Sequence, residues 1–199
     1  MLVQNRMTKN PETISPDEFL ASGLVKMHEG GFRRLPVIKD DKLIGIITDR
    51  DLREHAGLLE RTKISSAMTK DLMTVTPRAT LEQAAKLMLS HKISGLPVTD
   101  AGRLVGIITT SDILQTFLDL MGASEEGSFR IDFVLDEKHD LAAATQTIAE
   151  RGGEVLGVGT HQEKWEESRV CYLHLRGADP GKFAEALETK GYTVLGLYG

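Results

Sequence analysis

The chain has 199 residues, enough for one large domain or for two to three small ones. It carries 29 acidic and 24 basic residues, and its formal net charge of -5 argues against sequence-independent binding to nucleic acid. A single cysteine excludes a disulfide within the chain, and no apolar run approaches the length of a membrane span, so we expect a cytoplasmic protein. That cysteine, Cys171, lies in an alternating apolar run and is expected to be a buried, unreactive thiol.

The first part of the sequence is an internal duplication. Residues 6–52 align without a gap on residues 67–113, so that Met7 falls on Met68 and "LPV" at 35–37 falls on "LPV" at 96–98. Two copies of one unit commonly pack about a pseudo-twofold axis, because one apolar face then buries the other. The sequence therefore predicts two similar repeats, residues 1–60 and 61–121.

Each repeat is expected to form a strand, a helix, two strands and a second helix. A short extended segment that ends in proline ("ETISP", "MTVTP") precedes a helix with an apolar face. An extended "RLPVI" or "GLPVT", a polar turn, and the strand "LIGIIT" or "LVGIIT" follow. A second helix begins after the threonine, as "DLREHAGLLE" in one copy and "DILQTFLDLMG" in the other. The apolar faces comprise Phe19, Leu20, Leu24 and Met27 in the first helix of copy one, Leu81, Ala84, Ala85 and Met88 in that of copy two, and Ile113, Leu114, Phe117, Leu118 and Met121 in the last helix.

The remaining residues have a different pattern. "GASEEGS" at 122–128 has no periodicity and is typical of a linker. Residues 129–199 alternate strands and helices in the order β-α-β-β-α-β, which is the ferredoxin-like arrangement with both helices on one face of a four-stranded antiparallel sheet. The predicted fold class is therefore α+β, with two β-α-β-β-α repeats followed by a ferredoxin-like domain.

A threonine and an aspartate three residues apart follow the apolar strand in each copy. The pairs are Thr48 with Asp51 and Thr109 with Asp112. Thr-x-x-Asp is a capping box that starts a helix. The same pair can bind a nucleoside phosphate, because the carboxylate accepts from a ribose diol and the helix N-terminus faces a phosphate. Two copies, each after an apolar strand and an "LPV" segment, favour the ligand-binding interpretation, although capping stays open for both.

"LPV" followed by "G-I-I-T-x-x-D" resembles the cystathionine-β-synthase (CBS) motif, and two copies resemble a CBS-domain pair, the Bateman module. The C-terminal domain resembles an ACT domain, mostly in its topology. The whole order is similar to the AcuB-type proteins of acetoin utilisation. This resemblance implies a regulatory sensor that binds AMP, ADP or ATP, with S-adenosylmethionine less favoured, and that is not an enzyme. It also implies a homodimer through the CBS pair or the ACT-like sheet, which relays the bound state to the ACT-like domain or to an unidentified regulated protein.

The resemblance places one nucleotide site in each half of the cleft between the repeats, with the aspartate of one repeat facing the first strand and "PV" segment of the other. Arg33 and Arg34, which align with Ser94 and Gly95, mark the first site as the stronger phosphate site, and Arg50 would partly compensate in the second. Lys9 and Lys70 are further candidates for phosphate contacts. The first site comprises Thr109, Ser111 and Asp112 with Thr13, Ile14, Arg33, Arg34, Leu35 and Pro36; the second comprises Thr48, Arg50 and Asp51 with Thr74, Val75, Leu96 and Pro97.

Other functions find less support in the residues. The six histidines lack metal-ligand spacing, and there is no G-x-S-x-G, P-loop or C-x-x-C motif, so neither a metal site nor catalysis is indicated. The alternative function is amino-acid sensing by the ACT-like domain, with a structural CBS pair. The loop 135–141 of that domain lacks the glycine usual in amino-acid-binding ACT domains, which favours a structural or dimerising role. Trp165 is either an interface anchor or partly buried under its loop.

Overall fold

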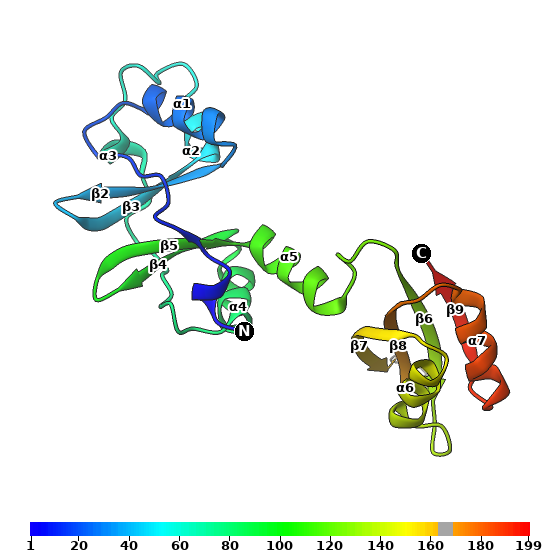
Figure 1. The fold of residues 1–199 in the computed structure, drawn as a ribbon. Helices are drawn as coiled ribbons and strands as arrows, with labels where there is room; N and C mark the ends of the chain where they lie inside the picture. Colours follow the sequence, from blue (N-terminus) through cyan, green and yellow to red (C-terminus); the bar gives the residue numbers. More distant parts are fainter. Residues whose placement is uncertain (163–168) are drawn as a thin grey trace. The chain divides into compact units, whose positions relative to one another are not determined.

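The computed structural model describes residues 1–162 and 169–199, which form a mixed α+β fold (Figure 1). Trp165 lies outside the described residues. The chain divides into two compact units, Met1–Ile113 and Leu114–Gly199. Within the described ranges, no helix is long and apolar enough to span a membrane, and no three His, Cys, Asp or Glu side chains are placed to hold a metal ion.

The N-terminal unit contains both repeats, and each repeat is built on an antiparallel hairpin. The hairpin β2–β3 belongs to the first repeat, and β4–β5 to the second, where β1 is added to give the order β1-β5-β4. Both hairpins carry a β-bulge at the same place, after Val37 and after Val98. The elements in chain order are the 3-10 helix η1 (Val3–Asn5), β1 (Thr8–Lys9), α1 (Leu20–Gly30), β2 (Arg34–Lys39), β3 (Lys42–Thr48), α2 (Asp49–Glu54), α3 (Ile64–Ala67), α4 (Leu81–His91), β4 (Gly95–Asp100), β5 (Arg103–Thr109) and α5 (Thr110–Met121).

The leading segment of each repeat packs on the other repeat. Thr8 pairs with Ile107 in the second hairpin, and the equivalent Thr69 pairs with Ile46 in the first. The exchange continues in the cores, because Val3 is fully buried among second-repeat residues and the matching Ile64 among first-repeat residues. The two repeats are thus joined by a reciprocal exchange of their first residues.

Two glycines make this exchange possible. A Cβ on Gly106 would lie 2.5 Å from Met7 Sδ and 2.9 Å from the backbone oxygen of Thr8. A Cβ on Gly45 would lie 2.5 Å from Met68 Sδ. The glycine in "GIIT" therefore allows the exchanged segment to lie directly on the strand.

The helices of the repeats depart from the expected pattern in three places. In α1 the core face is Leu20, Gly23 and Met27, whereas Phe19 and Leu24 are exposed. The helix expected over 51–60 covers only Asp49–Glu54 and gives way to turns that include Gly57. The segments "ETISP" and "MTVTP" form single parallel bridges, at Ile14 and Val75, rather than strands.

The C-terminal unit has the element order β-α-β-β-α-β. Its antiparallel sheet has the order β7-β8-β6-β9, and α6 and α7 cover one face, where Phe133, Ile148 and Leu187 are fully buried (Figure 1). Cys171 is buried in this core, and burial raises its pKa to about 11, so the thiol is protonated at neutral pH. The elements are β6 (Ser128–Leu135), α6 (Leu141–Glu150), β7 (Glu154–Gln162), β8 (Arg169–Arg176), α7 (Pro180–Thr189) and β9 (Val194–Tyr198).

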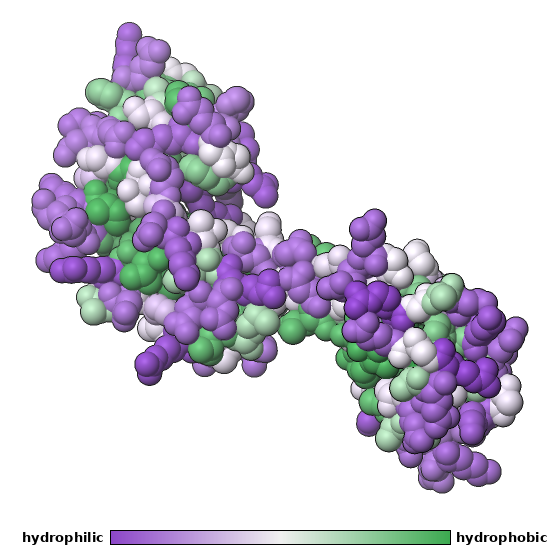
Figure 2. Space-filling view, in the orientation of Figure 1, coloured by the Kyte–Doolittle hydropathy of each residue, from purple (hydrophilic) through white to green (hydrophobic). Residues whose placement is uncertain are grey.

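Helix α5 keeps much of its apolar stripe exposed. Leu114, Phe117, Leu118 and Leu120 are between 37% and 60% exposed, whereas Thr116 is buried. Figure 2 shows hydrophobic residues at the surface along this helix.

We predict that Gly106→Ala destabilises the N-terminal unit by about 1–3 kcal/mol, because the new methyl group overlaps the exchanged segment and one of the atoms it meets belongs to the backbone. Urea unfolding measures the loss. The matched control is Gly57→Ala, which meets no heavy atom within 4 Å and should change stability by no more than about 0.5 kcal/mol. Equal effects of the two substitutions would contradict the role assigned to Gly106.

Candidate functional site

Both threonine–aspartate pairs lie where an apolar strand passes into a helix, and both form a capping box. Thr48 donates to Asp51 Oδ2 from its backbone N–H at 2.8 Å and from its hydroxyl at 2.6 Å. Thr109 donates to Asp112 Oδ2 in the same way, with both distances 2.7 Å. The capping interpretation therefore describes the local geometry in both repeats.

Capping does not use the whole carboxylate. At Asp51 both bonds from Thr48 fall on Oδ2, and among the described residues no hydrogen bond reaches Oδ1. A carboxylate has about four acceptor sites, so Oδ1 can accept a hydrogen bond from a ligand hydroxyl while Oδ2 keeps both capping bonds. Capping and ligand binding are thus compatible at this aspartate.

The second pair opens onto a cavity of about 370 Å³, the Asp112 cleft. Thr109, Ser111 and Asp112 come from the second repeat, and Pro36 and Phe32 come from the first. The full lining is Thr8, Asn10, Pro11, Glu12, Gly31, Phe32, Arg33, Arg34, Pro36, Ser94, Ile107, Thr109, Thr110, Ser111 and Asp112.

The first pair opens onto a cavity of about 580 Å³, the Asp51 cleft. Here Thr48, Arg50 and Asp51 come from the first repeat, and Pro97 and Met73 come from the second. Each cleft therefore combines an aspartate of one repeat with a proline of the other. The full lining is Arg33, Arg34, Ile46, Thr48, Asp49, Arg50, Asp51, Arg53, Glu54, Thr69, Asp71, Leu72, Met73, Lys92, Ile93, Ser94, Gly95 and Pro97.

Several residues expected at these sites lie elsewhere. Ile14, Leu35, Val75 and Leu96 are buried in the cores of the repeats. The backbone of Ile14 donates to the Pro36 carbonyl at 3.0 Å, and that of Val75 donates to the Pro97 carbonyl at 3.1 Å. Thr13 lines a separate cavity, and Thr74, Lys9 and Lys70 are exposed and line neither cleft. Neighbouring residues of the same segments supply the walls instead: Thr8, Asn10, Pro11 and Glu12 in the Asp112 cleft, and Thr69, Asp71, Leu72 and Met73 in the Asp51 cleft.

Arg33, Arg34 and Ser94 line both clefts. From the sequence we expected Arg33 and Arg34 to bind phosphate in the Asp112 site alone, but in the structure both residues line both cavities. Arg34 Nη2 donates to Ser94 Oγ at 2.6 Å. Burial lowers the pKa of Arg34, neighbouring Arg33 lowers it further, and Asp112 raises it.

The Asp51 cleft carries more charge than its twin. Arg50 and Arg53 line it, but Arg50 is paired with Glu54 at 3.2 Å, and Arg53 is paired with Asp49. The two partners of each ion pair are one helical turn apart on the exposed surface of α2, so each pair contributes little to stability. Either arginine can therefore leave its partner to bind an anion.

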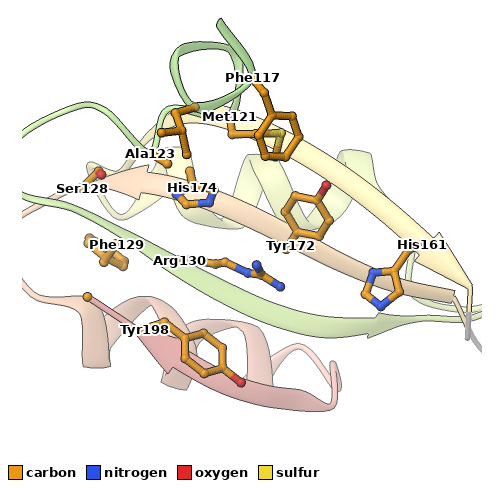
Figure 3. Close-up of a pocket in the computed structure, with 12 residues that line it drawn as sticks. Phe117, Met121, Ala123, Ser128, Phe129, Arg130, His161, Tyr172, His174 and Tyr198 are labelled. Carbon is orange, nitrogen blue, oxygen red and sulfur yellow. The ribbon is translucent and has the colours of Figure 1, made fainter. Parts of the chain in front are cut away.

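A third cavity, of about 640 Å³, lies on the face of the C-terminal sheet opposite α6 and α7 (Figure 3). Arg130 donates to both carboxylate oxygens of Asp132, at 2.5 and 2.6 Å, and its guanidinium lies 4.6 Å from the centre of the Tyr172 ring. The hydrogen bonds to Asp132 raise the pKa of Arg130. Phe117 and Met121 of α5 point toward this face (Figure 3).

His174 adds an unsatisfied polar atom to this cavity. Its Nδ1 is buried and has no hydrogen-bond partner among residues 1–162 and 169–199. Burial, followed by the charge of Arg130, lowers the pKa of this histidine, so the ring is neutral at pH 7. Gly159 leaves the space in which the Tyr172 ring lies, since a Cβ there would be 2.0 Å from that ring. No sequence motif marks this site, and the alternation of polar and aromatic residues on β6 and β8 is the signal that could have indicated it.

The chain belongs to the CBS-domain family, because the CBS domain model matches residues 3–57 and 64–119. Inosine-5'-monophosphate dehydrogenase of Korarchaeum cryptofilum is 37% identical over 123 residues, which are 60% of this chain and 25% of that protein. The chain thus spans about a quarter to a third of the length of the first curated relatives it matches. The CBS domain-containing protein YhcV of Bacillus subtilis is 37% identical over 116 residues, which cover 56% of this chain and 81% of YhcV.

Solved structures show the same tandem CBS pair. A putative acetoin utilization protein (AcuB) from Vibrio cholerae is 34% identical with a TM-score of 0.56, over 63% of this chain and 98% of that one. The CBS pair of protein MJ0100, in complex with 5'-methylthioadenosine and S-adenosyl-L-methionine, is 28% identical with a TM-score of 0.57, over 63% and 98%. CBSX2 in complex with AMP is 32% identical with a TM-score of 0.52, over 59% and 96%.

We predict that Asp51→Ala and Asp112→Ala each lower the stability of the N-terminal unit by about 0.5–2 kcal/mol, because each removes the acceptor of two capping bonds. Thermal or urea unfolding without added nucleotide measures the effect. Asp100→Ala, at an exposed strand end, serves as the matched control. Losses no larger than that of the control would show that the capping bonds do not stabilise the helices.

Proposed function

We propose that the chain is a regulatory sensor that binds an adenine nucleotide (AMP, ADP or ATP) in the two clefts of its CBS pair. The observation that carries this proposal is the crossed construction of each cleft. A carboxylate at a helix start, an arginine pair and a proline wall converge on one cavity, although they come from different repeats. These are the groups that a ribose diol, a phosphate and a base require.

The relatives support the choice of ligand class. The MJ0100 pair binds 5'-methylthioadenosine and S-adenosyl-L-methionine, and CBSX2 binds AMP. These ligands share an adenosine unit, and the arginine pair adds a preference for one that carries phosphate. S-adenosylmethionine, a cation at its sulfur, is less favoured beside Arg33 and Arg34.

Helix α5 offers a route for relaying the bound state. Its first turn carries Ser111 and Asp112 in the cleft, and its last turn carries Met121 in the C-terminal cavity. A nucleotide that changes the first turn acts on the same helix that lines this cavity. We propose that the receiver is the C-terminal unit, as an ACT-like domain, or a regulated protein bound to a homodimer of the chain. Such a relay requires that the ligand prefer one state of the helix over another.

We predict that AMP raises the melting temperature of the full chain and that calorimetry detects its binding. Asp112→Asn and Asp51→Asn should each weaken binding at their own cleft by about tenfold or more, because each removes a charged acceptor from the ribose. Asp100→Asn should bind as the wild type does. If AMP, ADP, ATP and S-adenosylmethionine all leave melting and calorimetry unchanged, the sensor proposal fails.

The alternative is an amino-acid sensor that uses the C-terminal unit. The observation that favours it is Arg130, which lines a cavity together with Tyr172 and Tyr198 and is held from beneath by the buried Asp132. The carboxylate of an amino acid could bind the guanidinium of Arg130. An aromatic side chain could then stack on Tyr172 or Tyr198.

For this alternative we expect L-phenylalanine to bind the wild type and not the double variant Arg130→Met/Asp132→Asn. The two residues are changed together because a lone buried aspartate would destabilise the sheet. The control is Arg151→Ala, at the exposed end of α6. Calorimetry that shows AMP binding but no heat with L-phenylalanine, L-tyrosine or L-tryptophan would reject the alternative and leave the nucleotide proposal intact.

A further inference from the structure

One arginine stands at the boundary between the two clefts. Arg34 begins β2, and its counterpart in the second repeat is Gly95, which begins β4. Each is paired with the threonine of its own motif: Arg34 lies opposite Thr48, and Gly95 lies opposite Thr109. The duplication therefore holds an arginine at one of two equivalent positions and no side chain at the other.

The space at Gly95 is filled by Arg34. A Cβ on Gly95 would lie 1.9 Å from Arg34 Nη1 and 2.8 Å from its Cζ. The same guanidinium donates through Nη2 to Ser94, the counterpart of Arg33. An arginine at position 95 would need the space that Arg34 occupies, so only one of the two equivalent positions can carry an arginine in this conformation. A single guanidinium therefore lies between the two repeats.

That guanidinium is poorly neutralised where it lies. Its hydrogen bond among the described residues is to the neutral hydroxyl of Ser94, which engages one of the five N–H donors of the group. Burial and Arg33 disfavour the charge, and Asp112 on one side favours it. A phosphate in either cleft would place a second anion beside the guanidinium, in addition to the nearby charge of Asp112.

We propose that Arg34 is a phosphate ligand shared by the two clefts, so that they compete for it. This inference rests on the proposed nucleotide-binding function. When a nucleotide in one cleft pairs with Arg34, the other cleft loses its donor and binds a phosphate-bearing ligand more weakly. Because coupling between sites is reciprocal, the effect is the same whichever cleft fills first.

Calorimetry of the full chain with AMP, and with adenosine as the probe that lacks phosphate, tests this sharing. Each substitution weakens its own cleft, so the tighter constant of Asp112→Asn is assigned to the Asp51 cleft, and the tighter constant of Asp51→Asn to the Asp112 cleft. The product of the two stepwise constants of the wild type should exceed the product of these single-cleft constants by at least about fivefold, the lower end of typical couplings. Adenosine should show no such excess.

Arg34→Ala should remove the excess for AMP, and Arg78→Ala, at an exposed position outside both clefts, should keep it. Two AMP molecules that bind independently to the wild type would overturn the sharing and leave the sensor proposal standing. An excess that survives in Arg34→Ala would also overturn it, as would a single-cleft variant that binds no AMP. If the wild type binds no nucleotide at all, the sensor proposal itself fails.

Discussion

The N-terminal unit depends on the close packing of each repeat's first residues against the glycine strand of the other. Gly106 admits Met7 and Thr8, and Gly45 admits Met68. This exchange buries Val3 and Ile64 in the core of the opposite repeat, so neither repeat has a complete core by itself. It also brings Thr8 and Pro11 to the wall of one cleft, and Thr69 and Met73 to the wall of the other. The contacts that hold the repeats together are thus the ones that shape both cavities.

The threonine–aspartate pairs cap their helices and also line the clefts that we propose as nucleotide sites. Both pairs close a capping box, and at Asp51 the capping bonds converge on one oxygen. The helix start is therefore already ordered before a nucleotide arrives, which limits the entropy that binding must spend on it. Each of these aspartates lines one cleft, whereas the single side chain of Arg34 lines both cavities.

The C-terminal unit presents its chemistry on the sheet face that its helices leave uncovered. A buried aspartate is tolerated there because Arg130 binds both of its oxygens, and Gly159 and Gly196 leave the space that the side chains of Tyr172 and Tyr198 occupy. Helix α5 supplies apolar side chains to the same cavity, and the rest of its apolar stripe stays exposed.

The duplication, the hairpins, most of the helices, the family and the Thr-x-x-Asp pairs could be predicted from the sequence, because each of these depends on periodicity or on residues close along the chain. The burial of Ile14 and Leu35 in the core and the short length of α2 could not be predicted in this way. The exchange of leading segments, the filling of the space at Gly95 by Arg34, and the cavity around Arg130 became visible in the folded structure alone. These features depend on which side chains fit together across the repeats or across the strands of a sheet, and local sequence patterns do not encode that fit.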